Sequence, residues 1–287
     1  MALYVDTGKP FRICQLTDIH LGGYPLGVED QKTLSGLRQI FSENNFDLIM
    51  ITGDLILGKE NNEPLESLRE LYDLLNEFEI PVAITYGNND TDGIYSRKCL
   101  RDFEQNLINL VPHNNSFLVD DKENYTLEVF DRKTDKLVNV LYIWDGGDYS
   151  QYAEISRYAV IDRHQINWYV KTTKNYFRRT FDLGFMHIPL PEYKEIDKSK
   201  VDGIYQDEVH CAGINSGLFY ELLNIGRVKA IFVGHDHNNN FSADFSGIGL
   251  NYGNVTGYNA KSKVNCGVSE ISLYKDHVIK KVIKFNN

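Results

Sequence analysis

The first half of the chain repeats one pattern, in which a short apolar run ends in a polar turn and is followed by apolar residues at helical spacing. The runs at residues 11–16, 46–52 and 80–86 have the length and composition of buried strands. The helical stripes that alternate with them consist of Leu34, Leu37, Ile40 and Phe41, and then of Leu68, Leu71, Leu74, Leu75 and Phe78. Because parallel strands need a long crossover connection, usually a helix, this order predicts a largely parallel sheet.

The second half predicts a second sheet. Three consecutive strands of an antiparallel stretch are expected at residues 116–121, 125–131 and 136–144. Further on, the pattern predicts a helix at 163–175, a strand at 181–187, a helix at 216–225, a strand at 228–235 and a hairpin at 268–285. No linker rich in proline, glycine or serine interrupts the series, so we expect one domain over residues 1–287 with two packed sheets.

Composition limits the classes of partner. The chain has 287 residues, of which 42% are hydrophobic and 24% charged, as in ordinary globular proteins. Its formal net charge of -10 argues against binding a nucleic-acid backbone through bulk electrostatics, although a local metal ion would still attract an anionic substrate. No apolar run approaches the roughly 18 residues of a membrane span.

The cysteines indicate a reducing compartment. Cys14, Cys99, Cys211 and Cys266 are far apart, and no CxxC motif occurs. Residues 1–16 lack the basic region and the apolar core of a signal peptide. We therefore expect a cytoplasmic protein.

Polar motifs follow five of the expected strands, each at the carboxyl end. In open α/β sheets, binding sites gather outside the carboxyl ends of the strands. The nitrogen and oxygen donors that these motifs contribute are Asp18, His20, Asp54, Asn88, His187, His235 and His237. Such donors suit a borderline or hard divalent metal ion.

The spacing of these donors favours a shared metal site. Asp18 and His20 are two residues apart, as are His235 and His237, and residues at this spacing in an extended chain face the same side. Glycines directly precede three of the seven donors and permit close backbone approach. Seven donors exceed one tetrahedral site and suit two metal ions with a bridging ligand. Because a carboxylate has two oxygens, Asp54 is the expected bridge.

The ordered motifs resemble those of the calcineurin-like metallophosphoesterase family, D-x-H, G-D, G-N-H-[DE], H and G-H-x-H. In this chain they are Asp18-Ile19-His20, Gly53-Asp54, Gly87-Asn88-Asn89-Asp90, His187 and Gly234-His235-Asp236-His237. The resemblance spans residues 11–255. Further stretches, including residues 145–150 and 187–193, resemble the Dcr2-like and purple-acid-phosphatase-29-like branch and its bacterial relatives.

The resemblance implies an α/β (α+β) fold, a four-layer αββα sandwich in which two mixed β-sheets are flanked by helices. It also implies two metal sites, the first built from Asp18, His20, Asp54 and His237 and the second from Asp54, Asn88, His187 and His235. The implied reaction is hydrolysis of phosphomonoesters or phosphodiesters by a metal-bound hydroxide, with two divalent ions of Mn, Fe or Zn. Leu57 stands where purple acid phosphatases have a tyrosine that binds ferric iron, so a required ferric ion is not expected.

Asn89 departs from the family pattern, which has a histidine at this position that protonates the leaving oxygen. Asparagine donates a hydrogen bond but delivers no proton near neutral pH, and loss of a general acid typically costs roughly 10²–10⁴ in rate. We expect Asp54, Asn88, Asn89 and His187 at the reacting phosphoryl group. Esters with acidic leaving groups, including aryl phosphodiesters, should therefore react better than alkyl monoesters.

The substrate-binding residues expected from their positions after the strands are Tyr24, Asn89 and Asp145. Asp148 and Tyr149 are further residues of the expected pocket. The alternative for the tyrosines and aspartates is that they pack within their loops.

Asp90, Asp92 and His113 each have two interpretations. Either aspartate would serve as an acid if burial raised its pKa, and the alternative is ordinary turn formation. His113 would reach the site from a loop or lie at the surface.

Two functions follow from these observations. The first is a metal-dependent phosphoesterase with phosphate esters as substrates. The second is a catalytically weakened metal-binding scaffold or regulatory protein, which is suggested by Asn89 in place of the family's histidine. The complete set of seven donors favours the enzyme, since a lapsed enzyme has no chemical reason to keep it.

Overall fold

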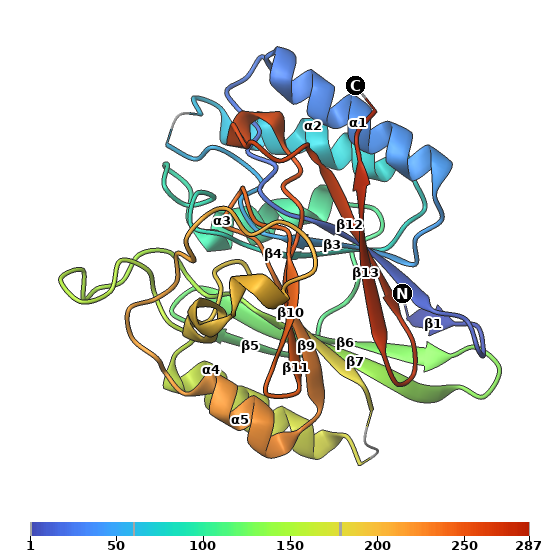
Figure 1. Cartoon of the computed structure of the whole chain (residues 1–287). Helices are drawn as coiled ribbons and strands as arrows, with labels where there is room; N and C mark the ends of the chain where they lie inside the picture. The colour runs from blue at the N-terminus through green and yellow to red at the C-terminus, as the bar shows by residue number, and fades with distance from the viewer. Residues whose placement is uncertain (1, 60, 178–179, 287) are drawn as a thin grey trace.

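The fold is a sandwich of four layers. A computed structural model describes residues 2–59, 61–177 and 180–286. Two mixed β-sheets lie face to face, and helices cover both outer faces (Figure 1). The predicted fold class is confirmed. No helix in these described stretches is long and apolar enough to cross a membrane.

The five-stranded sheet contains the parallel strands predicted from the first 86 residues. Its order is β13-β12-β2-β3-β4, and these strands span Val278–Lys284, Gly267–Leu273, Phe11–Leu16, Leu48–Thr52 and Val82–Thr85. Strands β2, β3 and β4 are parallel, whereas β12 is antiparallel to both β2 and β13. Its outer face packs against α1 (Val28–Glu43), α2 (Pro64–Asn76) and α3 (Arg97–Phe103).

The second sheet has eight strands in the order β1-β6-β7-β8-β9-β11-β10, with β5 also paired to β6. In chain order, β1 and β5 to β11 span Leu3–Val5, Asn114–Val119, Lys122–Asp131, Lys136–Trp144, Asp182–Phe185, Val228–Val233, Ser242–Phe245 and Ile248–Tyr252. Strands β7, β8, β9 and β11 are parallel, and the pairs β5–β6, β6–β7 and β10–β11 are antiparallel. Helices α4 (Arg163–Thr172) and α5 (Leu218–Ile225) cover its outer face.

In Figure 1, α1 and α2 lie at the top of the molecule and α4 and α5 at the bottom, with both sheets between them. Short 3-10 helices complete the chain, and η1 to η5 span Glu104–Asn106, Thr173–Asn175, Pro191–Glu195, Lys198–Lys200 and Tyr258–Ala260.

Alternation along each central strand builds three apolar layers. In β2, Phe11 and Ile13 face the core between the sheets, and Cys14 and Leu16 face the helices. Strands buried on both faces need apolar side chains at nearly every position, which is why these runs are continuous in the sequence. Full burial of one such large side chain contributes about 1.5–3 kcal/mol to folding.

Most predicted elements correspond to observed ones. The strand predicted at residues 11–16 is β2, and the helix predicted at 163–175 is α4 followed by η2. The elements not predicted are all short, namely β1, α3, β10 and β11 and the 3-10 helices η1, η3, η4 and η5. Short elements contain too few periodic positions to be recognised, and their pairing partners lie elsewhere in the chain.

The strands that precede the polar motifs end close together. The backbone N–H of Asp18, after β2, donates to the carbonyl of Gly53, after β3, at 3.1 Å. Across the sandwich, the Gln15 side chain in β2 donates to the carbonyl of Val233 in β9 at 3.2 Å. The carboxyl ends of strands from both sheets therefore form one site.

Candidate metal centre

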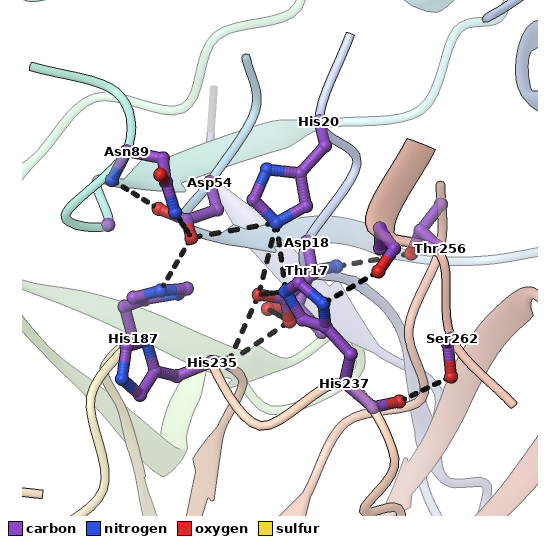
Figure 2. A network of polar contacts seen from close by, with 12 residues as sticks. Thr17, Asp18, His20, Asp54, Asn89, His187, His235, His237, Thr256 and Ser262 are labelled. Atoms are coloured by element: carbon purple, nitrogen blue, oxygen red, sulfur yellow. Dashed lines mark hydrogen bonds and ion pairs between the residues drawn. The ribbon is translucent and has the colours of Figure 1, made fainter. Parts of the chain in front are cut away.

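Six buried or half-buried side chains form two groups suited to metal ions (Figure 2). In each group the possible ligand atoms all lie within 4.8 Å of one another. The groups consist of Asp18, His20 and His237, and of Asp54, His187 and His235. The structure thus brings together residues from four of the five motifs, and the fifth motif contributes Asn88 beside them.

Asp54 lies between the two groups. Its Oδ2 atom is 3.7 Å from Nε2 of His20 and 3.2 Å from Nε2 of His187. One carboxylate oxygen therefore faces an imidazole of each group, and Figure 2 shows Asp54 flanked by both rings. This is the arrangement that a bridging ligand requires.

The first group is compact. Nε2 of His237 lies 2.9 Å from Nε2 of His20 and 3.4 Å from Oδ1 of Asp18. The other ring nitrogen of His237, Nδ1, donates to the carbonyl of Ala260 at 3.0 Å. This second contact fixes the ring and directs Nε2 into the site, as is usual for metal-binding histidines.

The second group contains buried polar atoms without partners. Nδ1 of His187 donates to the carbonyl of Thr52 at 2.8 Å. Within the described residues, buried Nε2 of His187 makes no hydrogen bond and faces the Asp54 carboxylate of its ion pair, and buried Oδ1 of Asn88 has no hydrogen-bond partner. Buried polar groups are normally satisfied, so these two atoms point to a ligand. A divalent cation fits the donors, because carboxylate oxygen, amide oxygen and imidazole nitrogen are all suitable ligands.

The backbone at the ligands is strained. The φ angles of Asp18, His20, Asp54 and His235 are 54°, 50°, 53° and 80°. For residues other than glycine, this left-handed conformation costs on the order of 1–3 kcal/mol each. Surrounding contacts hold it, and His235 N–H donates to both carboxylate oxygens of Asp18 at 3.1 Å.

Two glycines are required by close packing at the ligands. A Cβ atom on Gly87 would lie 2.1 Å from Oδ1 of Asp54, and one on Gly234 would lie 2.7 Å from Oδ2 of Asp18. Neither distance is possible for a real side chain. The expectation that these glycines permit close approach is confirmed.

Carboxylates and imidazoles neutralise one another in the metal-free chain. Burial opposes a charge on His187, but the adjacent Asp54 outweighs burial and raises the pKa of His187 to about 10. Burial likewise opposes a charge on His237, and Asp18 raises its pKa to about 9. Burial and the charge of His187 lower the pKa of His235 to about 3. Metal binding must therefore release protons from His187 and His237, so affinity falls as pH falls.

Asn89 is directed at Asp54. Its backbone N–H donates to Oδ1 of Asp54 at 2.8 Å, and its side-chain amide donates to Oδ2 at 2.6 Å. Asn89 therefore does more than form the turn, because its two hydrogen bonds fix the orientation of the Asp54 carboxylate between the two groups.

Asp90 organises the backbone around the same carboxylate. Its side chain is buried, and it accepts hydrogen bonds from the N–H groups of Gly87, Asp54, Leu55 and Ile56 at 2.7–3.2 Å. Burial raises its pKa to about 7. Asp90 thus forms the turn and also meets the condition of a pKa raised by burial, so its role as an acid stays a prediction.

Asp145 is occupied by an ion pair. Its carboxylate is only 2% exposed and accepts from Nε of Arg97 at 2.7 Å. Nη2 of Arg97 donates to the carbonyl of Gly87 at 3.0 Å. Arg97 takes up the charge of Asp145 and links it to the turn of residues 87–90, and substrate binding by Asp145 stays a prediction.

The other expected pocket residues lie in different places. Tyr24 lines a surface depression with residues of α1 and α2, and its contact with substrate stays a prediction. Tyr149 is half exposed, and its hydroxyl donates to Asp92 at 3.2 Å. His113 stacks on Tyr125 with ring centroids 3.6 Å apart, which is a packing role.

Sequence reasoning missed Tyr158. Its ring stands perpendicular to the ring of His235, with centroids 4.5 Å apart. No motif marks this tyrosine, because its partner is far along the chain and the contact arises only in the folded state.

Comparison with known proteins identifies the family of the chain. The family model of the calcineurin-like phosphoesterases matches residues 11–239. The chain belongs to the calcineurin-like phosphoesterase family.

Two curated relatives belong to the branch that the motifs resemble. The chain is 29% identical over 286 residues to "Probable inactive purple acid phosphatase 29" of Arabidopsis thaliana, which covers 88% of this chain and 73% of the relative. It is 29% identical over 274 residues to "Phosphatase DCR2" of Saccharomyces cerevisiae, with 82% and 45% covered. The predicted resemblance to this branch is confirmed.

A solved structure shares the fold. The crystal structure of a dimetal phosphatase from Danio rerio matches with a TM-score of 0.69 over 96% of both chains, at 14% identity. At this identity the likeness concerns the fold alone.

Proposed function

We propose that this chain is a phosphoesterase that uses two divalent metal ions to hydrolyse phosphomonoesters or phosphodiesters. The observation that carries the proposal is the position of Asp54, whose Oδ2 faces His20 of one group and His187 of the other. Oδ1 of buried Asn88 supports the proposal, since a buried amide oxygen without a hydrogen bond would be satisfied by a bound cation.

The proposed roles follow the two groups. Asp18, His20, Asp54 and His237 hold the first ion, and Asp54, Asn88, His187 and His235 hold the second. Bound divalent ions polarise a phosphoryl oxygen and make water a nucleophile at neutral pH. Mn, Fe and Zn are all compatible with this mixed nitrogen and oxygen donor set.

Asn89 limits the range of substrates. Its amide donates to Asp54 and delivers no proton, so the leaving oxygen departs without a general acid at this position. Leaving groups that are already weak bases suffer least from this loss. We therefore propose aryl phosphodiesters as better substrates than alkyl monoesters.

We also propose that residues 1–287 form a single domain that works in the cytoplasm. Cys14, Cys99, Cys211 and Cys266 are all free thiols, which supports a reducing compartment. The apolar core shared by both sheets supports one folding unit.

The test begins with metal content and turnover. Purified protein loaded with Mn²⁺, Zn²⁺ or Fe²⁺ is assayed with bis-p-nitrophenyl phosphate and p-nitrophenyl phosphate. Asp54→Asn and His187→Ala should abolish turnover and reduce bound metal. His277→Ala is the matched control, because His277 is exposed and its side chain contacts Asp276 and Tyr274, neither of which is a proposed ligand.

A metal-binding scaffold is the second candidate function. Asn89 favours it, as does the word "inactive" in the name of the Arabidopsis relative. Stoichiometric metal binding without turnover of either ester, whichever ion is loaded, would establish the scaffold in place of the enzyme.

A further inference from the structure

The loop between β7 and α4 folds back beside the metal centre. We call residues 148–159 the aromatic hairpin. Its two arms are joined by backbone hydrogen bonds, from Ala159 N–H to the Asp148 carbonyl and from Ser150 N–H to the Arg157 carbonyl, both at 3.0 Å. Figure 1 shows this part of the chain as the yellow-green loop that projects at the left.

Two tyrosines of the hairpin extend from the second metal group outward. Tyr158 contacts His235 edge-on with centroids 4.5 Å apart, and Tyr149 stacks on Tyr158 with centroids 5.9 Å apart at 24°. Burial raises the pKa of the Tyr149 phenol, and the nearby Asn88 side chain opposes that rise. The aromatic pair therefore begins at one proposed ligand, His235, and reaches another, Asn88.

One aromatic surface of the pair is open. Tyr158 is 6% exposed, whereas Tyr149 is 44% exposed although Tyr158 covers one side of it. The Arg157 guanidinium lies 5.2 Å from the Tyr158 ring, and no carboxylate in the described parts of the chain pairs with it. The hairpin thus presents a flat apolar surface beside a positive charge, which attracts anions to a chain of net charge -10.

The base of the hairpin is fixed to the turn at residues 87–91, which contains the proposed ligand Asn88. Buried Arg97 forms an ion pair with Asp148 and donates to the carbonyl of Gly87 at 3.0 Å. Thr91, in the same turn, donates to Asp148 at 2.8 Å. These contacts order the surface before any ligand arrives, which reduces the entropy lost on binding.

We propose that Tyr149 and Tyr158 form the subsite for a planar aromatic group of the phosphoester, with Tyr149 as the residue that determines this specificity. The inference rests on the proposed function and narrows its substrates to aryl or nucleoside phosphates. A planar ring stacked on Tyr149 keeps its phosphoryl group near Asn88. Aryl rings and nucleobases both stack on an aromatic side chain, since both present a π face.

Equilibrium binding of phosphonates tests the subsite without turnover. Mn²⁺-loaded protein is titrated with phenylphosphonate and with methylphosphonate, whose carbon–phosphorus bonds resist hydrolysis. Wild type should bind phenylphosphonate at least about fivefold more tightly. Tyr149→Leu should bring the ratio of the two affinities to about one, whereas Tyr149→Phe, which keeps the ring, should retain the wild-type ratio.

Tyr152→Leu is the matched control, because Tyr152 lies in the same hairpin and is 58% exposed. It should leave both affinities unchanged. Phosphonate analogues of adenosine 5′-monophosphate and ribose 5-phosphate then test whether the ring that stacks on Tyr149 is a nucleobase or an aryl group. A base-dependent gain indicates nucleoside esters, and its absence alongside a phenyl preference indicates aryl esters.

Equal binding of phenylphosphonate and methylphosphonate by wild type would overturn the inference, as would a phenyl preference that survives Tyr149→Leu. Failure of the proposed function gives a different result. If the protein prefers phenylphosphonate through Tyr149 but hydrolyses no ester, the subsite inference holds and the proposed phosphoesterase function fails.

Discussion

Replacing Arg97 with methionine should destabilise the protein far more than removing an exposed arginine. Arg97 is 5% exposed and its partner Asp145 2% exposed, so the substitution leaves a carboxylate buried without its counter-ion. The Gly87 carbonyl and the Thr91 hydroxyl oxygen each also lose a hydrogen-bond donor.

The magnitude follows from burial. Removing one partner of a buried ion pair costs about 3–5 kcal/mol, because the remaining charge is not solvated. Arg38 is the matched control, since it binds Glu77 through two hydrogen bonds of 2.7–2.8 Å but both side chains are about half exposed. Exposed pairs contribute about 0–1 kcal/mol, so Arg38→Met should change stability by less than 1 kcal/mol.

Urea unfolding of both variants with a chelator present measures the difference without metal linkage. Adding Asp145→Asn to Arg97→Met should restore part of the lost stability, because the uncompensated charge is removed. The reasoning is refuted if Arg97→Met unfolds at the same urea concentration as Arg38→Met. It is also refuted if the double variant is no more stable than Arg97→Met.

Three further predictions concern the site and its surroundings. Asn89→His should raise alkyl monoester turnover by roughly 10²–10⁴ and aryl diester turnover less, and unchanged alkyl rates would contradict the missing-acid argument. Burial raises the pKa of Glu104 to about 7, so its contribution to stability is full below about pH 4.5 and is lost as pH rises through 7. Relative to Glu104→Gln, wild type should lose about 2–3 kcal/mol between pH 5 and pH 8 in urea unfolding, and parallel pH profiles would exclude this linkage. Gly87→Ala should lower Mn²⁺ affinity at least about tenfold in calorimetric titration, because its Cβ would meet Asp54 at 2.1 Å. Gly146→Ala, with no contact nearer than 3.8 Å, is the control, and equal affinities of the two variants would count against the steric argument.

The sequence predicted those features that depend on local periodicity. Strand β2 was predictable because four of its six residues are apolar and a polar turn follows it, and His20 and His237 were placed in one site because both follow strand ends. Such features need only a few neighbouring residues to be recognised.

Features that depend on distant partners were not predictable. Asp145 follows β7 in a position typical of substrate residues, yet Arg97, 48 residues earlier, takes up its carboxylate. Tyr158 contacts His235 from a loop without a motif. Strand β1 has only three residues and pairs with β6 far along the chain, where Leu3 lies opposite Val129.

The contact between His20 and His237 has a consequence for the order of folding. These residues are 217 positions apart and come from different sheets, so their imidazoles meet only after both halves of the sandwich have assembled. Closing a loop of that length is an entropic loss that local structure cannot offset early, which makes the centre one of the last parts of the molecule to form. A metal ion that bound there would hold residues from both sheets together and, by binding the native chain alone, would stabilise it in proportion to the logarithm of the ion's concentration.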